Sequence, residues 1–93
     1  MLVKPIYCFD PEKNSWLIKQ RKISFEEVIA ILEKQGPIDV IVHPNKEKYP
    51  SQEIFIVEVN LYIYLVPFIQ NGNKVFLKTI FPSRKMQKKY LSR

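Results

Sequence analysis

Positively charged side chains gather in the last third of this 93-residue chain, and their chemistry is the most distinctive feature of the sequence. Residues 59–93 carry a net charge of +7 with no acidic residue, whereas residues 1–58 carry a net charge of −1. Arginine binds phosphate and carboxylate through a planar fork of donors, and lysine adds a flexible point charge. The asymmetry indicates a polyanion or an acidic protein as partner, with a basic face that merely aids solubility as the alternative. The cations of this segment are Lys74, Lys78, Arg84, Lys85, Lys88, Lys89 and Arg93.

Several other chemistries are excluded by residues that the chain lacks. Its two glycines cannot form a phosphate-cradling glycine loop, and one histidine with one cysteine cannot build a structural zinc site. The Gly-x-Ser-x-Gly turn of a nucleophilic serine is missing. The adjacent carboxylates Glu26 and Glu27 suit the start of a helix better than acid–base catalysis. We therefore expect no metal and no cofactor.

Two further side chains can take part in catalysis. His43 is the only imidazole, at the end of a predicted strand and before a loop, where catalytic residues often lie; a surface histidine without a role is the alternative. Tyr90 can stack on a base or donate a proton, and the alternative is that it packs the terminal helix against the core.

Metal-free RNA cleavage makes few demands on a protein. The RNA supplies its own 2′-hydroxyl nucleophile, and the protein orients it, moves protons and stabilises charge on the phosphate. A basic surface with a few Arg, Lys, Tyr or His residues is enough, so the composition is compatible with this chemistry.

The length predicts a single domain over residues 1–93. The longest apolar stretch, Leu61–Ile69, is too short to cross a bilayer, and the N-terminus lacks the regions of a secretory signal. Cys8 is alone and cannot form an internal disulfide. We expect a cytoplasmic protein that does not engage a membrane.

Two helices are predicted in the first half of the chain. Asp10-Pro11-Glu12 begins a helix that runs to about Arg21, and its C-terminal cations Lys19, Arg21 and Lys22 suit the negative pole of that helix. The sequence Ser24-Phe25-Glu26-Glu27 is a capping box, and an apolar stripe follows it. Gly36 takes the left-handed cap and Pro37 ends this second helix.

The rest of the chain predicts an antiparallel sheet and a terminal helix. Asn71-Gly72 indicates a hairpin between the last two long strands. The fold class is therefore α+β, with both N-terminal helices on one face of the sheet and a C-terminal basic helix along it. The predicted strands are Val3–Phe9 at an edge, Ile38–His43, Glu53–Val59, Leu61–Ile69 and Lys74–Phe81, with a polar loop over Pro44–Ser51.

The terminal helix, starting at Pro82-Ser83, is amphipathic. Met86 and Tyr90 lie on the side that we expect to pack on the sheet. Its other side carries only cations and should face solvent; these are Arg84, Lys85, Lys88 and Lys89.

Two segments resemble the BrnT family of toxins from type II toxin–antitoxin pairs. The first combines Phe9-Asp10-Pro11-x-Lys13-Asn14 with Ile23-Ser24-Phe25-Glu26-Glu27 at the family's spacing. The second is a hairpin strand that runs into Ser83-Arg84-Lys85 and a basic helix ending near Tyr90. The order of predicted elements agrees along nearly the whole chain.

The resemblance implies a RelE-like fold and a metal-independent endoribonuclease that inhibits translation by cleaving RNA. It also implies a cognate antitoxin with a ribbon-helix-helix DNA-binding domain. Arg84 is then the first choice for the scissile phosphate, with Arg21 and Tyr90 as further catalytic candidates. The RNA path would be lined by Lys19, Lys22, Lys85, Lys88 and Lys89.

The chain departs from the family pattern at two places. The family usually has Lys-His-Gly before the second capping box, where this chain has Gln20, Arg21 and Lys22, although Arg21 keeps a positive charge there. Ser83 replaces an alanine of the closing motif. The alternative function is a non-catalytic module that binds nucleic acid or a partner, such as a ParE-like poison or an inactive toxin descendant.

Overall fold

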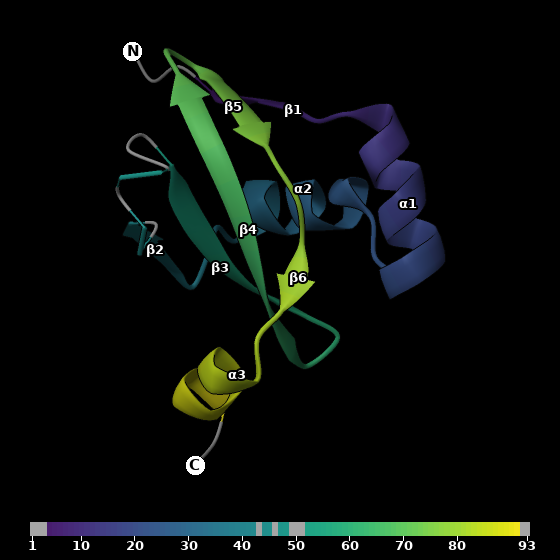
Figure 1. Ribbon diagram of the computed structural model, residues 1–93, viewed down its shortest axis with the longest axis vertical. Coiled ribbons are helices and arrows are strands. Elements are labelled where there is room, and N and C mark those ends of the chain that lie inside the picture. The colour runs from purple at the N-terminus through teal and green to yellow at the C-terminus, as the bar shows by residue number, and fades with distance from the viewer. Residues whose placement is uncertain (1–3, 43, 46, 49–51, 92–93) are drawn as a thin grey trace.

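The computed structural model describes residues 4–42, 44–45, 47–48 and 52–91 of the chain. Within these residues, three helices and a six-stranded mixed sheet confirm the α+β class (Figure 1). None of the helices in the described ranges is long and apolar enough to cross a membrane. The elements are β1 (Ile6–Cys8), α1 (Pro11–Arg21), α2 (Phe25–Lys34), β2 (Asp39–Val42), β3 (Glu53–Val59), β4 (Tyr62–Asn71), β5 (Lys74–Leu77), β6 (Phe81–Pro82) and α3 (Arg84–Leu91).

Both N-terminal helices begin at the predicted capping residues. The Asp10 carboxylate accepts a hydrogen bond from the Glu12 amide at 3.0 Å, which satisfies one of the free donors at the start of α1. At α2 the Ser24 hydroxyl accepts from the Glu27 amide, and the Glu27 carboxylate accepts from the Ser24 amide, so the capping box is complete. Gly36 has φ +79° and donates to the Ile31 carbonyl, as predicted for the end of α2.

A buried asparagine joins α1 to α2. Asn14 is 7% exposed, and its side-chain oxygen accepts a hydrogen bond from the Phe25 amide at 2.7 Å. Its side-chain nitrogen donates to the Glu26 carboxylate, also at 2.7 Å. One side chain thus satisfies a free amide in the first turn of α2 and fixes the angle between the helices.

The sheet has the strand order β1-β5-β4-β3-β2, and β6 pairs with β4 beside this path. The prediction of a purely antiparallel sheet is wrong at one edge, because β1 runs parallel to β5, with Tyr7 opposite Val75. A tight hairpin forces neighbouring strands to be antiparallel, but no hairpin joins β1 to β5, so their relative direction is free. The predicted position of β1 at an edge is confirmed.

The predicted strand Lys74–Phe81 is interrupted, and the structure divides it into β5 and β6. The Lys78 amide donates to the Pro67 carbonyl on β4 at 2.8 Å. Pro67 has no amide hydrogen with which to return the second bond of that pair, so the ladder stops there. The next segment bends away before β6 pairs with β4 again at Leu65.

Two tight hairpins connect β3, β4 and β5. Asn60 and Leu61 both have positive φ, +52° and +66°, which is the pattern of a type I′ turn. The leucine side chain has no polar atom that could form a local hydrogen bond and so stabilise the left-handed conformation, and Leu61 is 78% exposed. Gly72 lies at the predicted second hairpin with φ +64°, so Asn71 faces Lys74 across the turn.

The main core lies between the two N-terminal helices and one face of the sheet. Leu17 and Phe25, from α1 and α2, are completely buried there. In Figure 1, α2 lies behind β4 and α1 stands to its right, so both helices cover the same face, as predicted. The sheet contributes to this cluster the side chains of Phe55, Val57, Val59, Val66, Phe68, Val75 and Leu77.

Helix α3 contacts the opposite face, at one end of the sheet. Its Tyr90 reaches Asp39 on β2, which is paired with Ile56 on β3. Opposed residues of an antiparallel pair share a face, and successive residues alternate, so Ile56 lies on the other face from Phe55 and Val57. The basic helix is therefore separated from the main core by the thickness of the sheet.

We expect Asn14→Ala to lower the free energy of unfolding by about 1–3 kcal/mol, because the buried Phe25 amide loses the side-chain oxygen to which it donates. Urea denaturation followed by circular dichroism measures the change. Ser15→Ala, at an exposed neighbouring position, is the matched control and should change stability little. Equal stability of the two variants would show that the α1–α2 angle does not depend on Asn14.

Candidate nucleic-acid interface

Helix α3 presents an uninterrupted basic surface. Arg84, Lys85, Lys88 and Lys89 are all exposed, as predicted, whereas Met86, Gln87 and Tyr90 are half-buried toward the sheet. Arg84 is the first residue of α3, and the first turn holds no acidic residue. Cations at the positive pole of a helix are unfavourable unless an anion binds beside them. This end of α3 therefore combines a guanidinium, an ammonium and a helix pole that all attract an anion.

Two polar side chains attach α3 to the sheet. The Gln87 side-chain oxygen accepts a hydrogen bond from the Ile63 amide at 2.7 Å, and its nitrogen donates to the Leu61 carbonyl at 3.2 Å. The Tyr90 hydroxyl donates to the Asp39 carboxylate at 2.9 Å. One face of α3 is therefore anchored at both its middle and its end, which leaves the cationic face outward.

The bond to Asp39 changes the ionisation of Tyr90. The hydrogen bond raises the pKa of the Tyr90 hydroxyl above its ordinary value of 10.0, and desolvation and the negative charge of Asp39 raise it further. A raised pKa favours the protonated phenol, which keeps its proton on the bond to Asp39. The structure thus gives Tyr90 an anchoring hydrogen bond at the surface, whereas the alternative drawn from the sequence was packing in the core.

The second predicted group of cations lies at the end of α1, and its central member is engaged by the fold. The Arg21 guanidinium donates to the Ile80 carbonyl at 2.5 Å, in the segment between β5 and β6. Lys22 has φ +58° at the helix end, and its ammonium donates to the Lys19 carbonyl at 3.2 Å. Lys19 and Lys22 are exposed, while Arg21 is half-buried. The contact between Lys22 and Lys19 fits the helix-end role that the sequence indicates, whereas the bond of Arg21 to Ile80 is a tertiary contact.

The chain itself connects the two basic groups. Arg21 is bonded to Ile80, and Ile80 is four residues before Arg84. The Cα atoms of Ile80 and Arg84 are therefore at most about 14 Å apart. In Figure 1 the lower end of α1 and helix α3 lie on opposite sides of β6. The structure therefore brings Arg21 into the neighbourhood of the start of α3, with the segment 80–84 between them.

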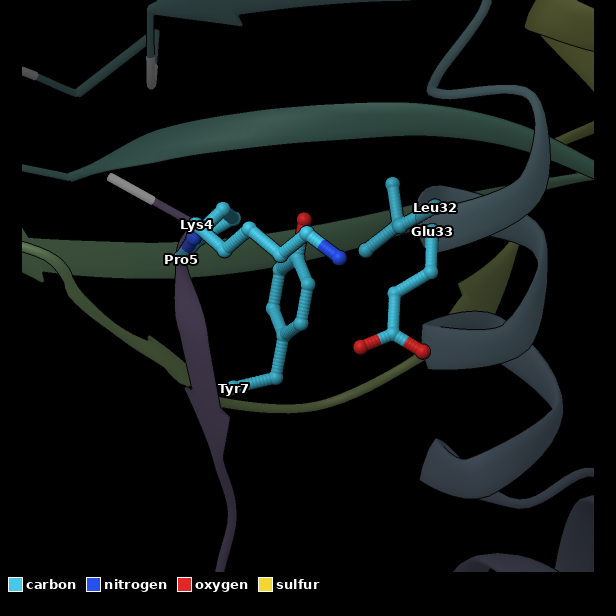
Figure 2. A pocket seen from close by; sticks show the side chains of 5 residues that line it. All are labelled: Lys4, Pro5, Tyr7, Leu32 and Glu33. Atoms are coloured by element: carbon cyan, nitrogen blue, oxygen red, sulfur yellow. The ribbon is translucent and has the colours of Figure 1, made fainter. Parts of the chain in front are cut away.

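A pocket of about 360 Å³ lies elsewhere, between β1 and the end of α2 (Figure 2). Lys4, Pro5 and Tyr7 line it from one side, and Leu32 and Glu33 line it from α2. Burial raises the pKa of Tyr7, and the charge of Glu33 adds to this effect. The pocket contains one ammonium and one carboxylate, so it lacks the positive excess that a nucleic-acid backbone requires. None of the predicted site residues lines it.

The sequence reasoning missed three side chains at these surfaces. Gln87 and Asp39 hold α3 through hydrogen bonds between segments that are distant in the sequence, and no local sequence pattern predicts such bonds. Trp16 on α1 is 43% exposed and lies between cations. The exposure of Trp16 could have been predicted locally. Trp16, Leu17 and Ile18 are successive apolar residues that spread over about 200° around the helix, so they cannot all face the core. His43, the other candidate from the sequence, lies outside the described residues.

No protein-family model, curated protein or solved structure matches this chain.

We expect the Tyr90 hydroxyl to titrate with a midpoint above 10, because its proton is held by Asp39. Its contribution to stability should be fully present below pH 10 and should be lost as the pH rises through the raised pKa, since the folded state binds the proton more tightly. The difference between the 295-nm titrations of the wild type and Tyr90→Phe isolates this group. In Asp39→Asn the midpoint should fall toward 10, and an unchanged midpoint would contradict the assigned cause.

Proposed function

We propose that this chain is the toxin of a type II toxin–antitoxin pair, a metal-independent endoribonuclease that inhibits translation by cleaving RNA. The observation that carries the proposal is the exposed cationic face of α3, which begins with Arg84 and is held outward by Gln87 and Tyr90. A surface of this kind follows a phosphate backbone, and an arginine at a helix N-terminus suits one particular phosphate.

The proposed reaction uses the RNA's own 2′-hydroxyl as nucleophile. The 2′-oxygen forms a bond to phosphorus, and the bond from phosphorus to the 5′-oxygen breaks. The 2′-hydroxyl loses its proton to solvent, and the leaving 5′-oxygen takes up a proton from solvent. Negative charge builds on the phosphoryl oxygens, and the Arg84 guanidinium stabilises it through charge-assisted hydrogen bonds. Lys85 and Lys88 hold the neighbouring phosphates.

The other predicted catalytic residues take positioning roles in this scheme. Arg21 fixes the segment before β6 through Ile80, and thereby the place where α3 starts. Tyr90 fixes the other end of α3 through Asp39. Lys19, Lys22 and Lys89 remain available to phosphates farther along the RNA, because all three ammonium groups are on exposed side chains.

The resemblance to the BrnT family supports the proposal, and with it a RelE-like arrangement of the fold. Its opening motif contains Asn14, Ser24, Glu26 and Glu27, and in this structure these residues make the bond between α1 and α2 and the capping box. The motif residues therefore have a physical reason to occur together. The order of two helices, a sheet and a basic terminal helix is compatible with that of the RelE-like toxins.

A toxin of this kind needs an inhibitor, and the basic surface indicates the kind of inhibitor. We propose a cognate antitoxin whose acidic segment covers the surface around Arg21 and Arg84, leaving its ribbon-helix-helix domain free to bind DNA. Complementary charges would give fast association and specificity. A flexible acidic segment would become ordered on binding and could cover a large area.

One observation favours a second function, a non-catalytic module that binds nucleic acid or a partner. The guanidinium of Arg21 and the hydroxyl of Tyr90 are already bonded within the protein. Of the three predicted catalytic side chains, Arg84 alone makes no hydrogen bond to another described residue of the fold. A basic surface with a single arginine suffices to bind RNA or a nucleic-acid enzyme without cleaving anything.

We expect Arg84→Ala to slow RNA cleavage by about 10²- to 10³-fold, because one donor to the transition-state charge is lost. Arg84→Lys should recover only part of the rate, since lysine lacks the fork of donors. Gel analysis of a single-stranded RNA, incubated with and without chelator, measures the rates.

Lys74→Ala, which removes an exposed cation on β5, is the matched control and should cleave at the wild-type rate. Full activity of Arg84→Ala at an unchanged melting temperature would remove Arg84 from the site. Tight RNA binding by the wild type without any cleavage would decide for the non-catalytic function.

We expect the affinity for RNA to fall steeply with salt, by about 0.7 in the log–log slope for each phosphate contact to a single strand. Lys85→Glu with Lys88→Glu should flatten the slope by about two contacts. The pair Lys74→Glu and Lys78→Glu changes the net charge equally but away from α3, and it should leave the slope nearly unchanged. Equal slopes for both pairs would show that α3 is only a solvated face.

A further inference from the structure

Helix α1 carries an exposed tryptophan on the side away from the core. Trp16 is the only tryptophan of the chain and is 43% exposed. Its neighbour Leu17 is completely buried in the main core, and a turn of about 100° per residue directs Trp16 away from that core. Exposing a large aromatic ring to water is unfavourable. Trp16 is not part of the main apolar cluster, so packing in that core does not explain its position.

Two cations lie over this ring. The Lys13 ammonium is 4.4 Å from the ring centroid, and the Arg21 guanidinium carbon is 4.9 Å from it. The two differ in freedom, because Arg21 is also bonded to the Ile80 carbonyl, whereas Lys13 is carried by a flexible four-carbon stem. The ring is thus held beside a fixed guanidinium and covered by an ammonium that can move aside.

We infer that Trp16 is a stacking platform for an unpaired base of single-stranded RNA, with Lys13 and Arg21 binding the phosphates on either side of that base. The inference rests on the proposed function, because it names the form of RNA that the protein takes and where the RNA enters. An exposed aromatic ring among cations is the combination by which proteins bind single strands: the ring stacks on a base, and the cations pair with the backbone.

The geometry favours a single strand over the other polyanions. In a duplex the bases are already stacked on their neighbours, so they cannot place a face on Trp16. An acidic peptide would satisfy Lys13 and Arg21, but it has no planar base to replace the ammonium on the ring. An unpaired base does both, because its ring takes the place of the Lys13 ammonium and its phosphates then bind that ammonium.

The platform and the proposed cleavage site lie along one path. Arg21 contacts both Trp16 and Ile80, and Ile80 is four residues from Arg84. A strand that stacks a base on Trp16 and crosses the segment 80–84 reaches the start of α3 with its backbone on Arg84. Figure 1 shows this segment running through β6 to α3.

The fluorescence of Trp16 tests the inference directly, because no other tryptophan contributes. The probe is a short 2′-O-methyl oligouridine, which lacks the nucleophile and cannot be cleaved through it. We expect saturable quenching by this strand and none by the same strand in a 2′-O-methyl duplex. Anisotropy of a labelled strand gives the affinity independently of the tryptophan.

Trp16→Ala should weaken binding of the labelled strand by about 5- to 150-fold, the range for one base stacked on an aromatic ring. Trp16→Phe keeps a ring and should lose much less. Ile18→Ala is the matched control: Ile18 is 48% exposed on the same helix, and its loss should leave the affinity unchanged.

Three outcomes would overturn the inference: binding of the strand without quenching, equal affinities of Trp16→Ala and Ile18→Ala, or quenching by an acidic partner protein but not by RNA. Cleavage of ordinary RNA is scored separately. Cleavage without quenching rejects the platform and keeps the proposed enzyme, whereas quenching without cleavage keeps the platform and rejects the enzyme.

Discussion

The hydrogen bonds of Asn14 are the interaction on which the arrangement of this protein depends. A single amide satisfies the first turn of α2 through Phe25 and holds Glu26, so α1 cannot rotate relative to α2 without leaving a buried donor unpaired. With α1 fixed, Leu17 enters the core, and Arg21 lies where it can reach the Ile80 carbonyl. A contact between two neighbouring helices thus positions a segment nearly sixty residues later.

The basic helix is attached by a different kind of interaction. Helix α3 makes no contribution to the main apolar cluster among the described residues; it is held by Gln87 against the β3–β4 turn and by Tyr90 against β2. Polar contacts at a surface allow the four cations of α3 to remain in water, where their mutual repulsion is screened. The core and the charged surface can therefore vary independently of each other.

The same separation divides the residues that build the fold from those that face solvent. Asn14, Ser24 and Glu27 act in capping and in joining helices, so they belong to the framework of the fold. The proposed function depends on a different set, the exposed cations of α3 and the aromatic ring on α1. A fold can host unrelated functions, and the surface residues carry the functional argument here.

The sequence by itself determined the starts of both N-terminal helices and the turn at Gly72, because each depends on interactions within a few residues. It likewise determined the strand Glu53–Val59, because its β-branched and aromatic residues favour extended structure. It also determined that the terminal helix turns a wholly basic face to solvent, since helical periodicity alone separates its cations from Met86 and Tyr90. Lys22 and Lys19 were correctly understood as helix-end residues for the same local reason.

Only the tertiary structure decided the rest. The parallel pairing of β1 with β5 joins residues about 68 positions apart, and the break after β5 depends on Pro67 in the facing strand. The partners of Arg21 and Tyr90 are 59 and 51 residues away, so no local pattern could tell an engaged side chain from a free one. Buried polar groups need hydrogen-bond partners, and the packed chain supplies them from segments that are distant in the sequence. The spacing of residues along the sequence does not show which distant segments meet.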